Sequence, residues 1–158
     1  MKSFRNYLTE VFDKPYSYKV IPNARREYKF SETYTFKLDD GRYGSAAVEE
    51  WSKGKLSFVF SVGAEIRVTG GGDQFRIYAT IGKIIDEILT NFEKETDRKF
   101  IELEFSADKF NTDQSRSGRS AKSDLYTRFA NKLARKHNLK VDIDARPSGI
   151  TEFYLRAK

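Results

Sequence analysis

The chain has 158 residues, of which 39% are hydrophobic and 33% are charged, and its 29 basic and 23 acidic side chains give a net charge of +6. It contains no cysteine and one histidine, so disulfide bonds, thiolate nucleophiles and cysteine-based zinc sites are excluded, and we predict no metal site. Neither a secretory signal nor a run of about 20 apolar residues occurs, which predicts a protein that is neither secreted nor transmembrane and has no membrane partner.

The first 33 residues are expected to precede the folded domain. Phe4, Tyr7 and Leu8 form a small apolar face on about one and a half helical turns, so we expect a short amphipathic turn at the start. Farther along, Pro15 and Pro22 disfavour helix and push the residues before them toward extended backbone. We therefore predict an N-terminal segment and extended lead-in over 1–33, followed by a single domain over 34–158.

Strands are predicted along the first half of the domain, where apolar and polar residues alternate with the period of two that a half-buried strand requires. Turn-forming residues separate them, among them the glycines at 70–72. We interpret these glycines as a hairpin turn or bulge, since the Lys-Ser/Thr of a phosphate-binding loop does not follow. In chain order the strands would form an antiparallel meander, and the predicted segments are 34–38, 44–51, 56–62, 65–69 and 74–79.

Two helices and three further strands are predicted in the second half. The first helix is expected to begin after Thr80, a potential cap, because the apolar residues that follow lie on one stripe. These are Ile81, Ile84, Ile85, Ile88, Leu89 and Phe92. The remaining segments are a strand over 100–105 beside 76–79, a polar loop over 108–119, a helix over 121–137 and a hairpin of 141–144 and 151–155. The predicted class is α+β, with a single mixed, mainly antiparallel sheet and two packed helices.

From Gln74 onward, the predicted order of strand, helix, strand, helix and hairpin resembles the second half of the GCN5-related acetyltransferase fold. In that family the turn after the fourth strand carries an Arg/Gln-x-x-Gly-x-Gly/Ala signature, whose amides hold the coenzyme A pyrophosphate at a helix N-terminus. The segment that we compare with this signature runs from Ala79 to Lys83. It has one glycine, Gly82, and it places Ile81 where the backbone must approach phosphate. The sequence therefore predicts no cofactor, acetyl-CoA included.

The same resemblance indicates one weak catalytic candidate. The family often uses the tyrosine of a Leu-Tyr pair in the following helix as a general acid, and Leu125-Tyr126 matches this pair. A tyrosine with a pKa near 10 can protonate a leaving thiolate when it is suitably placed. Packing beside Leu125 and Phe129 is the simpler interpretation of Tyr126, and the sequence leaves both roles open.

Positive charge is concentrated between Ser115 and Lys140, where eight basic residues stand against one acidic residue. The remainder of the chain is close to neutral, so this segment is expected to attract polyanions. We predict contact with DNA or another polyanion through a loop and the adjoining helix face, with a solvated helix face as the alternative. The predicted residues are Arg116, Arg119, Lys122, Arg128, Lys132, Arg135 and Lys136.

The opening of the chain resembles the capsid-targeting peptide of internal head proteins from T-even-like phages. In those proteins a Met-Lys-Thr-aromatic start runs to an Ile/Leu-x-Glu cleavage signal, and here Leu8-Thr9-Glu10 stands at the place of that signal. The sequence departs from the pattern at Ser3, where threonine is usual, and at Asn6, where an acidic residue is usual. The resemblance implies proteolytic processing between Glu10 and Val11 and a phage capsid or scaffold as a partner.

These features predict three alternative functions. The first is a bacteriophage virion protein, internal to the capsid and non-enzymatic, that contacts packaged DNA and is found in the virion interior or the host cytoplasm. The second is an acyltransferase-like enzyme, specifically an N-acyltransferase, or its inactive descendant. The third is a host-interaction or anti-defence protein, for which no residue identifies a target.

Overall fold

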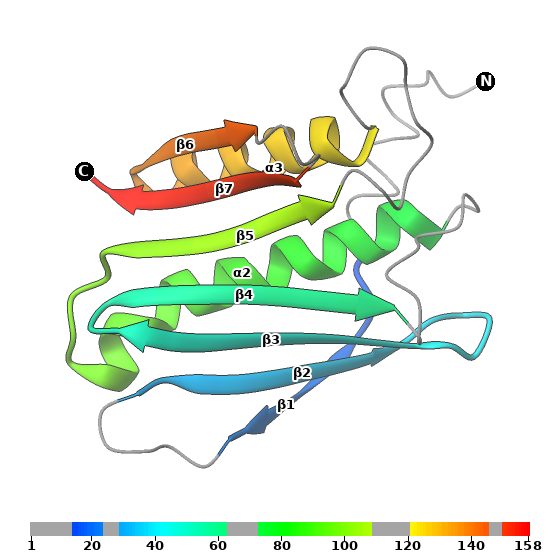
Figure 1. The fold of residues 1–158 in the computed structure, drawn as a ribbon. Helices are drawn as coiled ribbons and strands as arrows, with labels where there is room; N and C mark the ends of the chain where they lie inside the picture. The colour runs from blue at the N-terminus through cyan, green and yellow to red at the C-terminus, as the bar shows by residue number, and fades with distance from the viewer. Residues whose placement is uncertain (1–13, 24–28, 63–72, 109–120, 146–149) are drawn as a thin grey trace.

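A computed structural model describes residues 14–23, 29–62, 73–108, 121–145 and 150–158 of the chain (Figure 1). Within these ranges one mixed sheet of seven strands is packed against two helices, which confirms the predicted α+β class. The elements in chain order are β1 (Tyr18–Pro22), β2 (Ser31–Lys37), β3 (Tyr43–Ser52), β4 (Lys55–Val62), α2 (Asp73–Thr96), β5 (Glu102–Asp108), α3 (Ala121–His137), β6 (Leu139–Ala145) and β7 (Ile150–Ala157).

The strand order across the sheet is β1-β2-β3-β4-β5-β7-β6. The pairing of β4 with β5 is parallel, whereas the other neighbouring strands are antiparallel. Parallel strands cannot be joined by a tight turn, and α2 is part of the long connection between these two. The sheet is therefore mainly antiparallel with one parallel pair at its centre.

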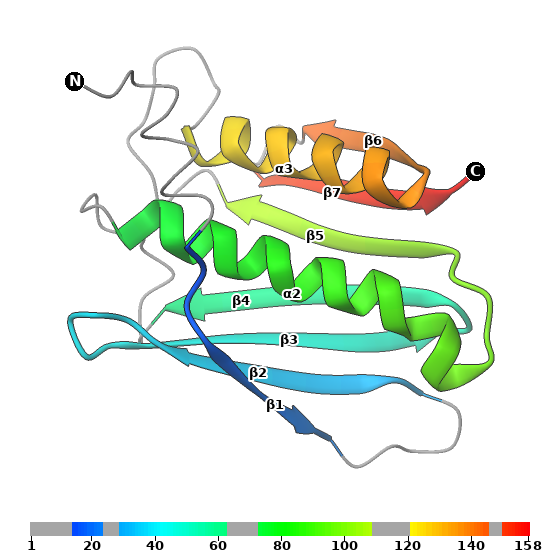
Figure 2. The ribbon, with the colours of Figure 1, turned by 180° about the vertical axis from the view of Figure 1, so that it is seen from behind.

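Both helices cover the same face of the sheet. They lie behind the strands in Figure 1 and in front of them in Figure 2, which shows the molecule from the opposite side. Successive side chains of a strand point to opposite faces of the sheet, and only one face is covered by helices. Leu56 and Phe58 of β4 are therefore buried on the helix side, whereas Val59 is 61% exposed on the other face. Among the described elements, the second face of the sheet carries no helix.

The buried stripe of α2 supplies much of the core, and the predicted apolar residues of this helix are buried or partly buried there. Ile85→Ala is expected to lower the free energy of unfolding by about 2–5 kcal/mol, because it removes a fully buried side chain and leaves a cavity. Urea denaturation followed by circular dichroism measures this change. The exposed Thr90→Ala on the same helix is the control, and an equal loss in both variants would contradict this packing.

The strand predicted over 74–79 is wrong, because these residues form the first turns of α2. Ile77 and Tyr78 are buried and extend the helical stripe toward the N-terminus. Thr80 is consequently not a cap but an interior residue, whose hydroxyl donates to the Arg76 carbonyl oxygen at 2.7 Å. The strand predicted over 100–105 corresponds to β5, and its parallel neighbour is β4 instead of 76–79. The segment predicted as a strand over 65–69 lies outside the described residues.

The sheet also begins earlier than the predicted domain start at Tyr34. β1 pairs along β2, and Tyr16, just before β1, is buried. The Tyr16 backbone N–H donates to the Thr80 hydroxyl at 2.8 Å, and the Arg76 guanidinium lies 3.9 Å from the centre of the Tyr16 ring. The extended lead-in from residue 14 onward is therefore the edge of the domain, held against α2.

Candidate ligand cleft and basic groove

The centre of the sheet opens between β4 and β5. These strands pair at three positions, Lys55↔Glu102, Leu56↔Leu103 and Ser57↔Glu104, although β4 continues to Val62 and β5 to Asp108. The two strands diverge beyond this point in Figure 1. Backbone groups on the facing edges of the two strands are consequently not used for pairing with each other along most of their length.

A cleft of about 100 Å³ lies where the strands separate. Phe58 and Phe105 are buried on the helix side and supply apolar surface, whereas Val59 and Ser106 are exposed. The full lining consists of Ser57, Phe58, Val59, Glu104, Phe105, Ser106 and Glu152. The cleft therefore combines aromatic surface, hydroxyl groups and two carboxyl groups.

Glu104 has an environment suited to proton transfer. Burial raises the pKa of its carboxyl group, and the negative charges of Glu102 and Glu152 raise it further. The nearby cation does not offset this effect, because the Arg156 guanidinium donates to Glu102 at 2.8 Å and to Asp142 at 2.7 Å. A carboxyl group in a cleft whose pKa is raised above its ordinary value is a candidate general base.

Tyr126, the weak catalytic candidate, is fully buried in α3. Its ring makes edge-on contacts with five aromatic rings at centroid distances of 5.0 to 5.9 Å. The rings belong to Phe60, Tyr78, Phe105, Phe129 and Phe153. Burial holds the pKa of the Tyr126 phenol well above its usual range, so the group keeps its proton. A packing role is evident, and contact with Phe105 places the ring behind the wall of the cleft.

The segment from Ala79 to Lys83, compared above with the pyrophosphate-binding signature, lies in the interior of α2. It is therefore not a connection that follows a strand. The connection between β4 and α2 is 63–72, and it contains Arg67-Val68-Thr69-Gly70-Gly71-Gly72. This sequence has the spacing Arg-x-x-Gly-x-Gly. Its structure lies outside the described residues, as does that of the glycines predicted to form a turn or bulge.

Of the residues predicted to bind nucleic acid, Arg116 and Arg119 lie outside the described residues, and Lys122 belongs to α3 without a described side chain. Arg128, Lys132 and Arg135 are exposed on α3. In the part of the chain that the structure describes, these three residues form no ion pair.

Lys136, the last of the predicted cations, joins the two helices instead. Its Nζ donates to Asp86 Oδ2 of α2 at 2.7 Å, and His137 Nε2 lies 2.6 Å from Asp86 Oδ1. Burial alone would raise the pKa of Asp86, but the hydrogen bonds and positive charges of Lys136 and His137 hold it below its usual value. Lys136 is thus engaged in a contact between α2 and α3.

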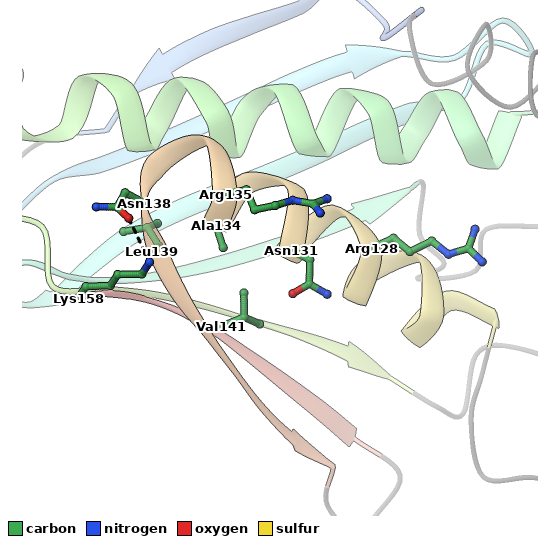
Figure 3. A pocket seen from close by; sticks show the side chains of 8 residues that line it. All are labelled: Arg128, Asn131, Ala134, Arg135, Asn138, Leu139, Val141 and Lys158. Carbon is green, nitrogen blue, oxygen red and sulfur yellow. Dashed lines mark hydrogen bonds between the residues drawn. The ribbon is translucent and has the colours of Figure 1, made fainter.

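A groove of about 690 Å³ runs between α3 and β6, and two of the exposed arginines line it (Figure 3). Its lining consists of Arg128, Asn131, Ala134, Arg135, Asn138, Leu139, Val141 and Lys158. The sequence predicted the cations of α3 but not the groove that two of them line. Lys158 is 18 residues beyond the basic stretch, and it reaches the groove only because β7 returns beside β6.

The predicted processing residues Glu10 and Val11 lie outside the described residues. Among the residues that are described, no group of three or more His, Cys, Asp or Glu side chains is arranged to hold a metal ion. No helix in the described ranges has the length and apolar character needed to cross a membrane. Comparison of the chain with family models, curated proteins and solved structures finds no match.

Proposed function

We propose that the protein is an acyltransferase that binds an acyl-coenzyme A thioester in the cleft between β4 and β5. The observation that carries the proposal is the position of this cleft. It lies where the parallel pair separates, on the strand that leads into 63–72 and then α2. The order of β4, α2, β5, α3 and the β6–β7 hairpin supports the resemblance to the GCN5-related acetyltransferases.

The cleft suits the extended arm of coenzyme A, which is narrow and carries two amide groups. Where β4 and β5 separate, strand backbone groups can donate to and accept from such amides, as they would with an added strand. Phe58 and Phe105 offer apolar contact to the methylene groups between the amides. The cleft holds the thioester end of the ligand, and the rest would extend along the connection toward α2.

The sequence of that connection supports the binding of the pyrophosphate. Arg67 supplies a cation, and the spacing of Gly70 and Gly72 matches the signature by which the resembling family holds pyrophosphate. α2 begins directly after the glycines at Asp73, and the N-terminus of a helix favours an anion. On this proposal the protein binds acetyl-CoA, which differs from the sequence-based prediction of no cofactor.

Glu104 would act as the proton acceptor at the same cleft. Glu104 and Glu152 place negative charge there, which attracts an acceptor that carries an amino group. Glu104 would then remove a proton from the amine as its nitrogen attacks the thioester carbonyl, and the C–S bond would break so that coenzyme A leaves as its thiolate. Tyr126 retains its proton, and a role as proton donor to the departing thiolate stays a prediction.

Isothermal titration calorimetry with acetyl-CoA tests the proposal. We expect heat of binding below about 1 mM ligand, and we expect Ser106→Trp to weaken binding at least tenfold because the indole fills the cleft. Ser45→Trp in β3, on the same sheet face but outside the cleft lining, should bind like the wild type. No heat from the wild type at millimolar acetyl-CoA, or equal loss in both variants, would overturn the proposal.

The other functions predicted from the sequence stay predictions. A virion-internal protein in contact with packaged DNA depends on the N-terminal resemblance and on the cations of α3. Mass spectrometry of purified virions tests it, since a chain beginning at Val11 would support it and absence from virions would refute it. A host-interaction or anti-defence role has no identified target residue.

A further inference from the structure

The groove between α3 and β6 has features that the proposed acyl transfer does not use. In Figure 3, Asn131 points from α3 toward Val141 on the facing strand, while the Arg128 and Arg135 side chains extend along the helix, and all four residues line the groove. Lys158 is at the end of the chain next to β7, and its Nζ donates to Asn138 Oδ1 at 3.1 Å. The groove therefore has cations and amides along its sides.

The floor of the groove is apolar. Ala134 is buried, and Leu139 and Val141 are partly buried against the core. Aromatic side chains, on which unpaired bases would stack, are absent from the described lining. An occupant that carries charged and aliphatic groups on one face fits this lining better than a nucleic acid does.

In the described residues, the strand beside the groove is the edge strand of the sheet. β6 is the last strand in the sheet order and pairs on one side with β7, and no other described strand pairs with it. Backbone groups along the second side can add an extended polypeptide by main-chain hydrogen bonds. A polypeptide at this edge would lie next to α3.

The positive charge of the groove favours an acidic partner at this edge over a second copy of the chain. The described lining contains the side chains of Arg128, Arg135 and Lys158 and no Asp or Glu, while Asp142 of β6 is engaged on the other sheet face by Arg156 at 2.7 Å. A second copy of the chain paired through β6 would bring the cations of two α3 helices together, which is unfavourable. An acidic partner is attracted to the same surface.

We propose that this groove binds an extended acidic segment of a partner protein. The segment adds to the outer edge of β6, and every second side chain of it faces α3. Among these side chains, carboxylates lie against Arg128, Arg135 and Lys158, and aliphatic groups pack on Ala134, Leu139 and Val141. This site is independent of the acyltransferase proposal, because it uses different residues and does not need a thioester ligand.

Fluorescence anisotropy tests the site in the full chain at constant salt, with the labelled eight-residue peptide Ser-Glu-Ser-Val-Ser-Glu-Ser-Val, whose Glu and Val side chains share one face of an extended strand. We expect binding with a Kd below about 1 mM, weakened about tenfold or more by Arg135→Glu. Lys132→Glu is the matched control, since it reverses one exposed charge on the same helix outside the groove lining, and it should weaken binding less than about threefold. Circular dichroism verifies that both variants fold.

Four outcomes would overturn the proposal. Absence of peptide binding would show that the groove is not a peptide site. Equal weakening by Lys132→Glu and Arg135→Glu would indicate a general attraction of the acidic peptide to a cationic helix. A backbone N-methylated peptide that binds as tightly as the unmodified one excludes strand addition. Tighter binding of a 20-nucleotide single-stranded DNA than of the peptide at the same salt concentration assigns the surface to nucleic acid.

Discussion

Glu50→Ala is expected to lower the free energy of unfolding by about 3–5 kcal/mol, the range for a buried ion pair that loses one partner. The Glu50 side chain is 1% exposed and pairs with the guanidinium of Arg98. Its carboxylate also accepts from the backbone N–H groups of Phe30 and Gly54, both at 2.9 Å. Removing it leaves a partly buried cation and two amides without their acceptor.

This ion pair also supports the cleft. Gly54, in the turn between β3 and β4, adopts a φ of +80°, and its carbonyl oxygen accepts from the N–H groups of Ile101 and Glu102 at 2.9 and 3.2 Å. Glu50 therefore connects the turn before β4 to the start of β5, at the end of the cleft where these strands are paired. Loss of the carboxylate should disturb the geometry of both strands.

Chemical denaturation measures the effect, with the exposed neighbour Glu49→Ala as the control that should change stability by less than about 0.5 kcal/mol. Burial alone would raise the pKa of Glu50, but Arg98 and the two backbone amides hold it below its ordinary value of 4.5. Its charge therefore stabilises the fold above that value and ceases to do so as pH falls through the lowered pKa. The stability gap between the wild type and Glu50→Gln should shrink in acid, and a gap that widens would contradict this role.

Tyr126→Ala is expected to cost about 3–5 kcal/mol of stability, because truncating a buried aromatic side chain leaves a large cavity. The ring lies among five others and links α3 to α2, β4, β5 and β7. The loss should appear as a lower midpoint of urea denaturation. A change below about 1 kcal/mol would mean that the aromatic cluster repacks without this ring.

Tyr126→Phe separates packing from proton donation. It retains the ring and its contacts, so stability should change by less than about 1 kcal/mol. If the hydroxyl serves as an acid, the variant should transfer the acyl group more slowly while its affinity for acetyl-CoA stays constant. An unchanged rate would assign Tyr126 to packing alone.

Much of the fold was predictable because its strands and helices have strong periodicity. The alternation along 56–62 corresponds to β4, and the predicted helix over 121–137 has the same bounds as α3. The segment 74–79 failed because Phe75, Ile77 and Ala79 alternate like a strand, although Ile77 and Tyr78 also continue the helical stripe of α2. A short apolar run fits both periods, and packing against the sheet decides between them.

The wrong strand prediction for 74–79 also moved the predicted ligand-binding connection away from 63–72. The interpretation of 74–79 as a strand places the connection after that strand at 79–83, and it assigns Arg67 to a strand over 65–69 and Gly70 and Gly72 to a turn or bulge. The cleft itself could not be predicted, because it depends on where β4 and β5 stop pairing, and β5 follows β4 by 40 residues. The early start of the sheet was missed for a similar reason, since Tyr16 is buried only by its contact with α2.

Nuclear magnetic resonance titration with coenzyme A tests the central claim most directly, because it locates the ligand on the chain. The account predicts that backbone amide signals of 57–59 and 104–106, on the two sides of the cleft, shift with ligand concentration, while those of 131–135 in the α3 groove do not. Unmoved signals on both sides of the cleft at millimolar ligand, or shifts confined to the groove, would contradict it.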